Sequence, residues 1–162
     1  MKKFVIAIGI VGLVAAFAGV AAADGPTYVG AQKCKMCHKL QYTSWMETHH
    51  AKATEIAKKG AEGRPFEASC LKCHATNADE NLPGVQCEAC HGPGSAYKKM
   101  SVMKDLEKAK ANGLEIVNQA TCDRCHTGDD HSSKVVFSEK VNDKAAIHEF
   151  KNAELAKQMM GQ

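Results

Sequence analysis

Apolar positions are distributed unevenly along this chain of 162 residues. The range 4–23 is almost entirely apolar, and the rest mixes short apolar stripes with charged and turn-forming residues. Apolar positions at helical spacing predict helices over 44–59, 95–112 and 142–159. Ser44-x-x-Glu47 has the form of a capping box at the start of the first of these helices. Gly60 and Gly113 follow the first two as stop signals, and no stretch alternates like a strand.

The first 23 residues have the three parts of an export signal. Met1-Lys2-Lys3 is basic, an apolar run follows, and Ala21-Ala22-Ala23 supplies small residues before Asp24. The alternative is an uncleaved membrane anchor, because the apolar run is just long enough to span a bilayer. We expect a cleaved signal peptide over 1–23, a single domain over 24–162 and no membrane span after cleavage.

The cysteines all belong to one repeated motif, Cys-x-x-Cys-His. Its four copies are Cys34/Cys37/His38, Cys70/Cys73/His74, Cys87/Cys90/His91 and Cys122/Cys125/His126. This is the attachment signature of c-type haem, in which two thiols bind the porphyrin and the histidine ligates the iron. Zinc sites and a disulfide framework are the alternatives, but neither explains a histidine after every second cysteine. The motifs predict four covalently bound haems.

Four haems would take up much of the interior of a chain of this length. Cleavage would leave roughly 140 residues, or about 35 per haem, too few to enclose each cofactor separately. We therefore expect a mostly α-helical chain with extensive loops, wrapped around four packed haems. Aromatic residues make up only 6% of the chain, in keeping with a core built largely of cofactor.

The formal charge of +3 is offset by haem propionates, so nothing indicates nucleic-acid binding. The lysines over 98–110 indicate a solvated face or a docking patch for a redox partner.

The second axial ligand of each iron decides between electron transfer and ligand chemistry. The histidines outside the motifs are His49, His50, His131 and His148. His49 and His50 would lie about 100° apart on a helix, so both cannot serve one iron. His131 follows Asp129-Asp130 and is either a ligand or part of a polar loop. Four candidates for four irons leave the pairing open.

Three segments resemble the tetrahaem cytochrome c-554 family. These are Val29-Gly30 before the first motif, Trp45 with Thr48-His49-His50-Ala51-Lys52-Ala53 after it, and Gly84 to Ser95 around the third motif, including Cys-Glu-Ala-Cys-His-Gly-Pro-Gly. The resemblance implies a mostly helical, compact multihaem fold and periplasmic electron transfer, including shuttling from hydroxylamine oxidation. The family also overlaps with subunits of extracellular conducting filaments.

The resemblance also implies individual ligands. It makes His50 the distal ligand of a remote haem and His148 that of the first haem. The family places a further distal histidine after Gly-Pro-Gly, where this chain has Tyr97, so Tyr97, Met100, Met103 or another histidine is the candidate there. Family members leave the haem matching His74 five-coordinate.

The sequence thus predicts an electron-transport protein that binds haem iron and is more an electron carrier than an enzyme. We expect it in the periplasm, with secretion or an outer-surface position as the alternative. Its partners would be quinol-side or hydroxylamine-type dehydrogenases as donors and terminal reductases as acceptors. Two other functions remain open: a small reductase of nitrogen oxides or hydroxylamine at a five-coordinate haem, and a filament subunit rather than a monomer.

Overall fold

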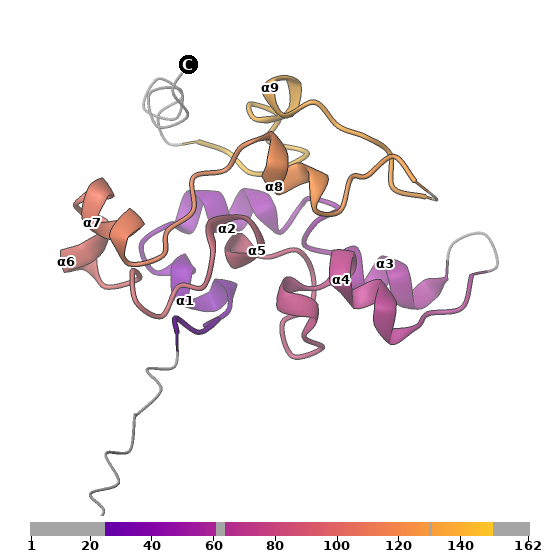
Figure 1. The fold of residues 1–162 in the computed structure, drawn as a ribbon, viewed down its shortest axis with the longest axis horizontal. Helices are drawn as coiled ribbons and strands as arrows, with labels where there is room; N and C mark the ends of the chain where they lie inside the picture. The colour runs from indigo at the N-terminus through magenta and orange to yellow at the C-terminus, as the bar shows by residue number, and fades with distance from the viewer. Residues whose placement is uncertain (1–24, 61–63, 130, 151–162) are drawn as a thin grey trace, which may run out of the picture.

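The computed structural model describes residues 25–60, 64–129 and 131–150. The predicted signal peptide and the end of the predicted helix over 142–159 lie outside these residues. Within them the chain forms short helices joined by long irregular segments (Figure 1). The α-helices are α1 Ala31–Lys35, α2 Lys39–Trp45, α3 Ala53–Lys59, α4 Leu71–His74, α5 Cys87–His91, α6 Met100–Met103, α7 Leu106–Ala111, α8 Gln119–Asp123 and α9 Phe137–Lys140. Two 3₁₀ turns, Ala68–Cys70 and Thr76–Ala78, flank α4.

The predicted fold class, mostly α with extensive loops, is confirmed. In the described part of the chain the β contacts are isolated bridges, which join Ala75 to Pro83 and Gly84. None of the helices among the described residues is long and apolar enough to cross a bilayer.

The predicted helix over 44–59 is broken in two. The chain leaves α2 after Trp45 and turns before α3, because the buried Thr48 hydroxyl donates to the Trp45 carbonyl at 2.7 Å. This hydroxyl also accepts a bond from Ala51 N–H, so a side chain competes with the helical backbone. The capping box at Ser44 was wrong, since Ser44 lies inside α2 and its hydroxyl accepts a 2.7 Å bond from Glu149 N–H.

The predicted helix over 95–112 is likewise two helices, α6 and α7. The Asp105 carboxylate caps α7 by accepting a 3.0 Å bond from Lys108 N–H. Such a cap fixes a helix start, which explains the break. Gly113, at φ +95°, follows the end of α7, as predicted. Between residues 142 and 150 the predicted third helix is absent, and the chain forms turns there.

Among the described residues, the buried apolar side chains pack in small clusters. Ala31, Tyr42 and Trp45 form one, and Tyr97, Val102 and Ala109 form another. The largest fully buried side chains are instead polar: Glu88, Thr48 and Thr76. The polypeptide alone therefore has little of the continuous apolar core expected for a domain of this size.

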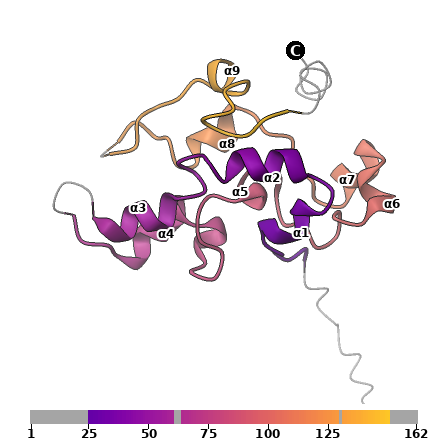
Figure 2. The same ribbon diagram turned by 180° about the vertical axis from the view of Figure 1, so that it is seen from behind.

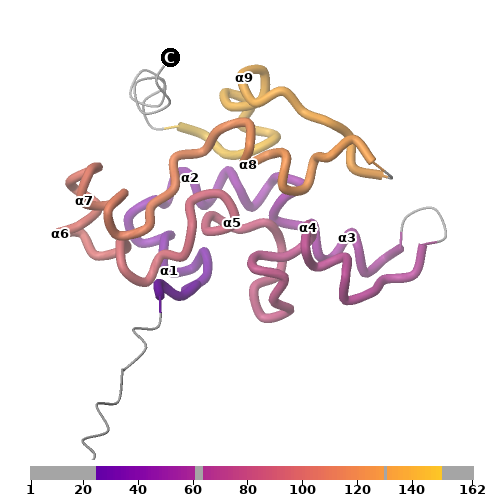
Figure 3. Tube along the Cα trace, in the orientation of Figure 1, coloured from indigo at the N-terminus to yellow at the C-terminus, as the bar shows by residue number. Residues whose placement is uncertain are grey.

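The helices are spread out along the molecule. In both ribbon views α6 and α7 lie at one end, α3 and α4 at the other, and α1, α2 and α5 between them (Figures 1 and 2). The segment from 141 to 150 returns alongside α2 (Figure 3), where the bond from Glu149 to Ser44 fixes it. This return brings His148 from the far end of the described chain to the first motif.

Candidate functional site

Each Cys-x-x-Cys-His motif folds into a single helical turn. In the first motif His38 N–H donates to the Cys34 carbonyl at 2.9 Å, and His126 repeats this bond to Cys122 in the fourth. The second and third motifs lie within or at the ends of α4 and α5. A helical turn places residues three and four apart on one face. Both thiols and the histidine of a motif are therefore directed to one cofactor.

Cys37 differs from the other cysteines of the motifs. It is exposed, whereas the remaining seven are partly buried. The physical reason is its position in the short surface turn between α1 and α2, where the neighbouring His38 is exposed as well. An exposed thiol is still able to attach a haem, so the role of Cys37 in haem binding stays a prediction.

The four motifs are neighbours in space in a defined order. The Cys34 and Cys87 thiols share a hydrogen bond, which lowers the pKa of Cys34 and raises that of Cys87. A second bond joins Cys73 to Cys125. Burial, aided by the charge of Cys122, raises the pKa of Cys90 to about 11. These contacts connect motif one to three, three to four, and four to two.

Backbone carbonyls orient the histidine rings of three motifs. Nδ1 donates to Ala53 O at 3.1 Å in His74, to Glu115 O at 3.2 Å in His91, and to Ser133 O at 2.9 Å in His126. A carbonyl can only accept, so Nδ1 carries the proton and Nε2 keeps its lone pair. Metal-ligating histidines are typically held in this way.

These residues fit four c-type haems. All eight cysteines are free thiols, and thiols are what covalent attachment needs. Burial lowers the pKa of His91, with smaller contributions from neighbouring groups, and so favours the neutral imidazole that binds a metal. A hollow of about 510 Å³ opens beside the fourth motif and is lined by His126, Gln119 and Val136. Haem would supply reversible one-electron chemistry at each motif.

Three of the four histidines outside the motifs lie near a motif histidine. The His50 ring centroid is 6.2 Å from that of His126, and the His131 centroid is 5.8 Å from that of His74. The charge of His38 contributes to a lowered pKa at His148, where burial is the main cause. His49 is exposed. His49 and His50 lie in the turn between α2 and α3 and not, as predicted, on a helix.

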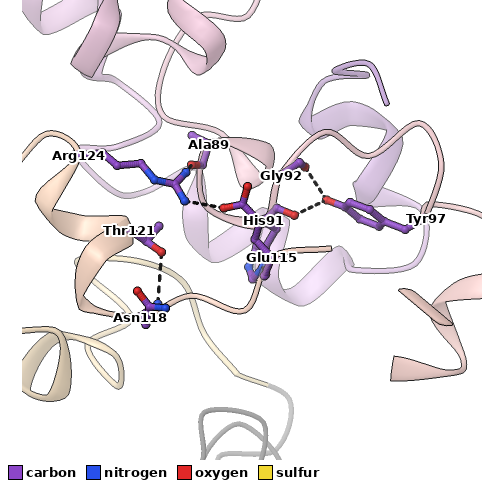
Figure 4. A network of polar contacts seen from close by, with 8 residues as sticks. All are labelled: Ala89, His91, Gly92, Tyr97, Glu115, Asn118, Thr121 and Arg124. Carbon is purple, nitrogen blue, oxygen red and sulfur yellow. Dashed lines mark hydrogen bonds and ion pairs between the residues drawn. The ribbon is translucent and has the colours of Figure 1, made fainter. Parts of the chain in front are cut away.

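Tyr97 is engaged with the backbone of the third motif. Its hydroxyl donates to Gly92 O at 2.7 Å and lies 3.0 Å from His91 O (Figure 4). Burial raises the pKa of Tyr97, which opposes the phenolate form that binds ferric iron. Of the two methionine candidates, Met100 is exposed and Met103 packs against the cluster around Val102.

Figure 4 also shows how the third and fourth motifs are joined. The Arg124 guanidinium donates to Ala89 O at 3.2 Å and forms an ion pair with the Glu115 carboxylate. Arg124 lies between the cysteines of motif four, and Ala89 between those of motif three. The Glu115 carbonyl holds the His91 ring, so one residue orients the ligand and anchors the neighbouring motif.

Glu88 is the structural residue that sequence reasoning missed. It lies between Cys87 and Cys90, is 1% exposed, and accepts backbone hydrogen bonds from Val29, Gly30 and Gly94 at 2.6 to 3.0 Å. The signal was present in the segments that carried the family resemblance, because Val29-Gly30, Glu88 and Gly94 all belong to them. Glu88 ties the first motif to the third.

Comparisons with known proteins find similarity to multihaem cytochromes. Residues 33–92 match the family described as cytochrome c554 and c-prime, and residues 64–143 match that of cytochrome c3. Cytochrome c-554 of Nitrosomonas europaea is 32% identical over 143 residues, covering 65% of this chain. The chain spans 59% of the length of that relative.

The fold has a counterpart of known structure. The reduced state of cytochrome c554 from Nitrosomonas europaea superimposes with a TM-score of 0.60 at 24% identity, over 84% of this chain and 97% of the other. At this level of identity the likeness shows a shared fold. The chain is thus similar to the cytochrome c-554 family of multihaem c-type cytochromes, whose members bind their haems covalently and transfer electrons.

Proposed function

We propose that this protein is a periplasmic electron carrier in which electrons pass between four haems held by one small domain. The observation that carries the proposal is the spatial order of the motifs, in which thiols of different motifs contact one another. Cofactors attached at adjoining turns lie close together, and short separations favour fast electron exchange. The protein residues set the ligands, burial and electrostatics that tune each potential.

The contacts between motifs suggest a linear route. Motifs one and three are joined by the hydrogen bond between the Cys34 and Cys87 thiols and by Glu88. Motifs three and four are joined by Arg124. Motif four reaches motif two through the Cys125 thiol, which lies 3.9 Å from Lys72 O. Electrons would then enter or leave at the first and second motifs, on opposite ends of the route.

A lysine-rich surface beside the first motif is suited to docking a redox partner. Lys98, Lys99, Lys104 and Lys108 are all exposed on or beside α6 and α7. The pKa of the Cys34 thiol is lowered mainly by its hydrogen bond with Cys87, and the charge of nearby Lys98 adds to this shift. A positively charged surface at one end of the route would attract a partner with acidic residues around its own cofactor.

The proposal is tested by stopped-flow mixing of the fully reduced holoprotein with an oxidised acceptor cytochrome that has an acidic face. We expect about four electrons to leave each chain, in phases that slow as ionic strength rises. Replacing Lys98 and Lys99 by glutamate should weaken this salt dependence, whereas Lys58→Glu, at the other end of the molecule, should not.

The competing functions predict other results. A reductase would consume hydroxylamine, nitrite or nitric oxide catalytically when supplied with a reductant, and would lose this activity when its open iron is blocked by cyanide. A filament subunit would form ordered polymers in negative-stain images under native conditions. Catalytic turnover of such a substrate, without electron delivery to the acceptor, would contradict the carrier proposal.

A further inference from the structure

The imidazole rings of His131 and His74 lie close together at the second motif. Their ring centroids are 5.8 Å apart, and their ring planes make an angle of 18°. The two residues are far apart in sequence and belong to different segments, α4 and the loop after the fourth motif. Tertiary folding alone therefore brings these two rings together.

The separation matches that of two imidazoles bound to one metal ion. An imidazole nitrogen binds a first-row metal at about 2 Å, and adding the half-width of each ring places the two centroids about 6 Å apart. Direct face-to-face packing would bring the rings closer together. The ring centroids of His50 and His126 have a similar separation, 6.2 Å.

The surroundings of the His74 ring favour a metal on its Nε2 side. Nδ1 donates to Ala53 O at 3.1 Å, so the proton is fixed there. The Thr54 hydroxyl donates to the His74 carbonyl and so also holds the backbone of this turn. Both partners come from α3, which packs against α4.

Arg64 is a neighbour of the His131 ring that would have to adjust. Nη1 of Arg64 lies 3.4 Å from His131 Nδ1, the nitrogen that carries a proton when Nε2 binds a metal. At 3.4 Å between exposed groups this contact is long for a hydrogen bond. Metal binding at Nε2 would therefore require the Arg64 guanidinium to move away from Nδ1.

We propose that His131 is the distal ligand of the iron attached at Cys70/Cys73/His74, so that the second haem of this protein is six-coordinate. The proposal rests on covalent haem attachment as set out above. It departs from the five-coordinate second haem that the family resemblance implies. The second motif then takes part in electron transfer and has no vacant iron face for a small molecule.

The test is electron paramagnetic resonance of the oxidised holoprotein, comparing wild type with His131→Ala and His49→Ala. We expect His131→Ala to gain about one high-spin ferric iron per chain, and added imidazole to return it to low spin. His49 is exposed and lies outside both close histidine pairs, so His49→Ala should match the wild type. An unchanged high-spin count in His131→Ala, with four haems attached, would overturn the proposal.

Two further measurements distinguish loss of the distal ligand from loss of haem or of the fold. A pyridine haemochrome assay counts attached haems, and fewer than four in the wild type would contradict the proposed function itself and not the ligand pair. If His131→Ala loses haem or fails to fold, His131→Met is examined instead. A methionine ligand should give the spectrum and raised potential of histidine–methionine coordination at one haem. A wild-type spectrum in that variant would exclude His131 as a ligand.

Discussion

The carboxylate of Glu88 accepts a 2.6 Å hydrogen bond from the backbone N–H of Gly94. The same carboxylate binds the N–H groups of Val29 and Gly30, just before the first motif. A Cβ at Gly94 would lie 3.0 Å from Glu88 Oε1, so the glycine permits this close approach. One buried acidic side chain thus fixes the loop after the third motif and the entrance to the first.

Replacing Glu88 by glutamine should destabilise the holoprotein. The amide has one acceptor oxygen in place of two, and its NH₂ group would face backbone donors. Bonds to a charged acceptor are worth roughly 1.5 to 3 kcal/mol each, so we expect a loss of about 2 to 4 kcal/mol in the free energy of unfolding. Denaturant unfolding measures this loss.

Glu107→Gln is the control for Glu88→Gln, because the ion pair that Glu107 forms with Lys110 is exposed to solvent. It should change stability by less than about 0.5 kcal/mol. Equal effects of the two substitutions would show that the Glu88 hydrogen bonds do not stabilise the fold.

Gly84→Ala should disturb the turn that carries His50. Gly84 has φ +80°, and a Cβ there would lie 2.5 Å from Ala51 O and 3.1 Å from His50 O. We expect a loss of at least about 3 kcal/mol and a perturbed low-spin spectrum, because the His50 backbone has to move. Thermal unfolding and electron paramagnetic resonance are the measurements.

Gly113→Ala separates backbone strain from this collision. Gly113 also has a positive φ, of +95°, but a Cβ there would meet only Pro26, at 3.6 Å. The cost should be about 1 to 2 kcal/mol, from backbone conformation alone. If both glycine variants lose the same stability, the contact with Ala51 is not the cause.

Trp45→Phe should remove the link between α2 and the segment before the third motif. The indole Nε1–H of Trp45 donates to Val85 O at 2.9 Å, and the residue is 8% exposed. Phenylalanine keeps an apolar ring but leaves this carbonyl without its donor, at a cost of about 1 to 3 kcal/mol. Met46→Leu, at an exposed neighbouring position, should leave the unfolding midpoint unchanged in the same experiment.

Tyr97→Phe should leave the haem spectra as they are. The Tyr97 hydroxyl donates to the Gly92 carbonyl and lies 3.0 Å from the His91 carbonyl, and burial raises its pKa. We expect a small destabilisation of about 1 kcal/mol and unchanged spin states. A new high-spin signal in the variant would instead identify Tyr97 as a ligand.

The sequence by itself determined the chemistry, because that chemistry resides in local patterns. Cys-x-x-Cys-His needs only one helical turn to present two thiols and an imidazole, so the four motifs could be read without the fold. The absence of alternating apolar positions likewise indicated a helical chain with few strand contacts. Segments such as Cys-Glu-Ala-Cys-His-Gly-Pro-Gly were specific enough to indicate the resemblance to the cytochrome c-554 family.

Helix boundaries were predicted less well, for a physical reason. Helical spacing over 44–59 and 95–112 was real, but side chains interrupted both helices. Thr48 takes the Trp45 carbonyl and Asp105 caps a new start. Ser44 is bonded to Glu149 rather than to its own helix. Sequence distance conceals such contacts, so the apparent capping box could not be distinguished from a tertiary hydrogen bond.

Only the tertiary structure decided which motifs adjoin and which histidines meet. The Cys34–Cys87 and Cys73–Cys125 contacts and the His74–His131 pair join residues far apart in sequence. No local preference encodes such pairs, since they depend on how irregular segments pass one another. Local patterns fixed the chemistry of each motif, and long-range packing set the order of the motifs and the second histidine beside the second motif.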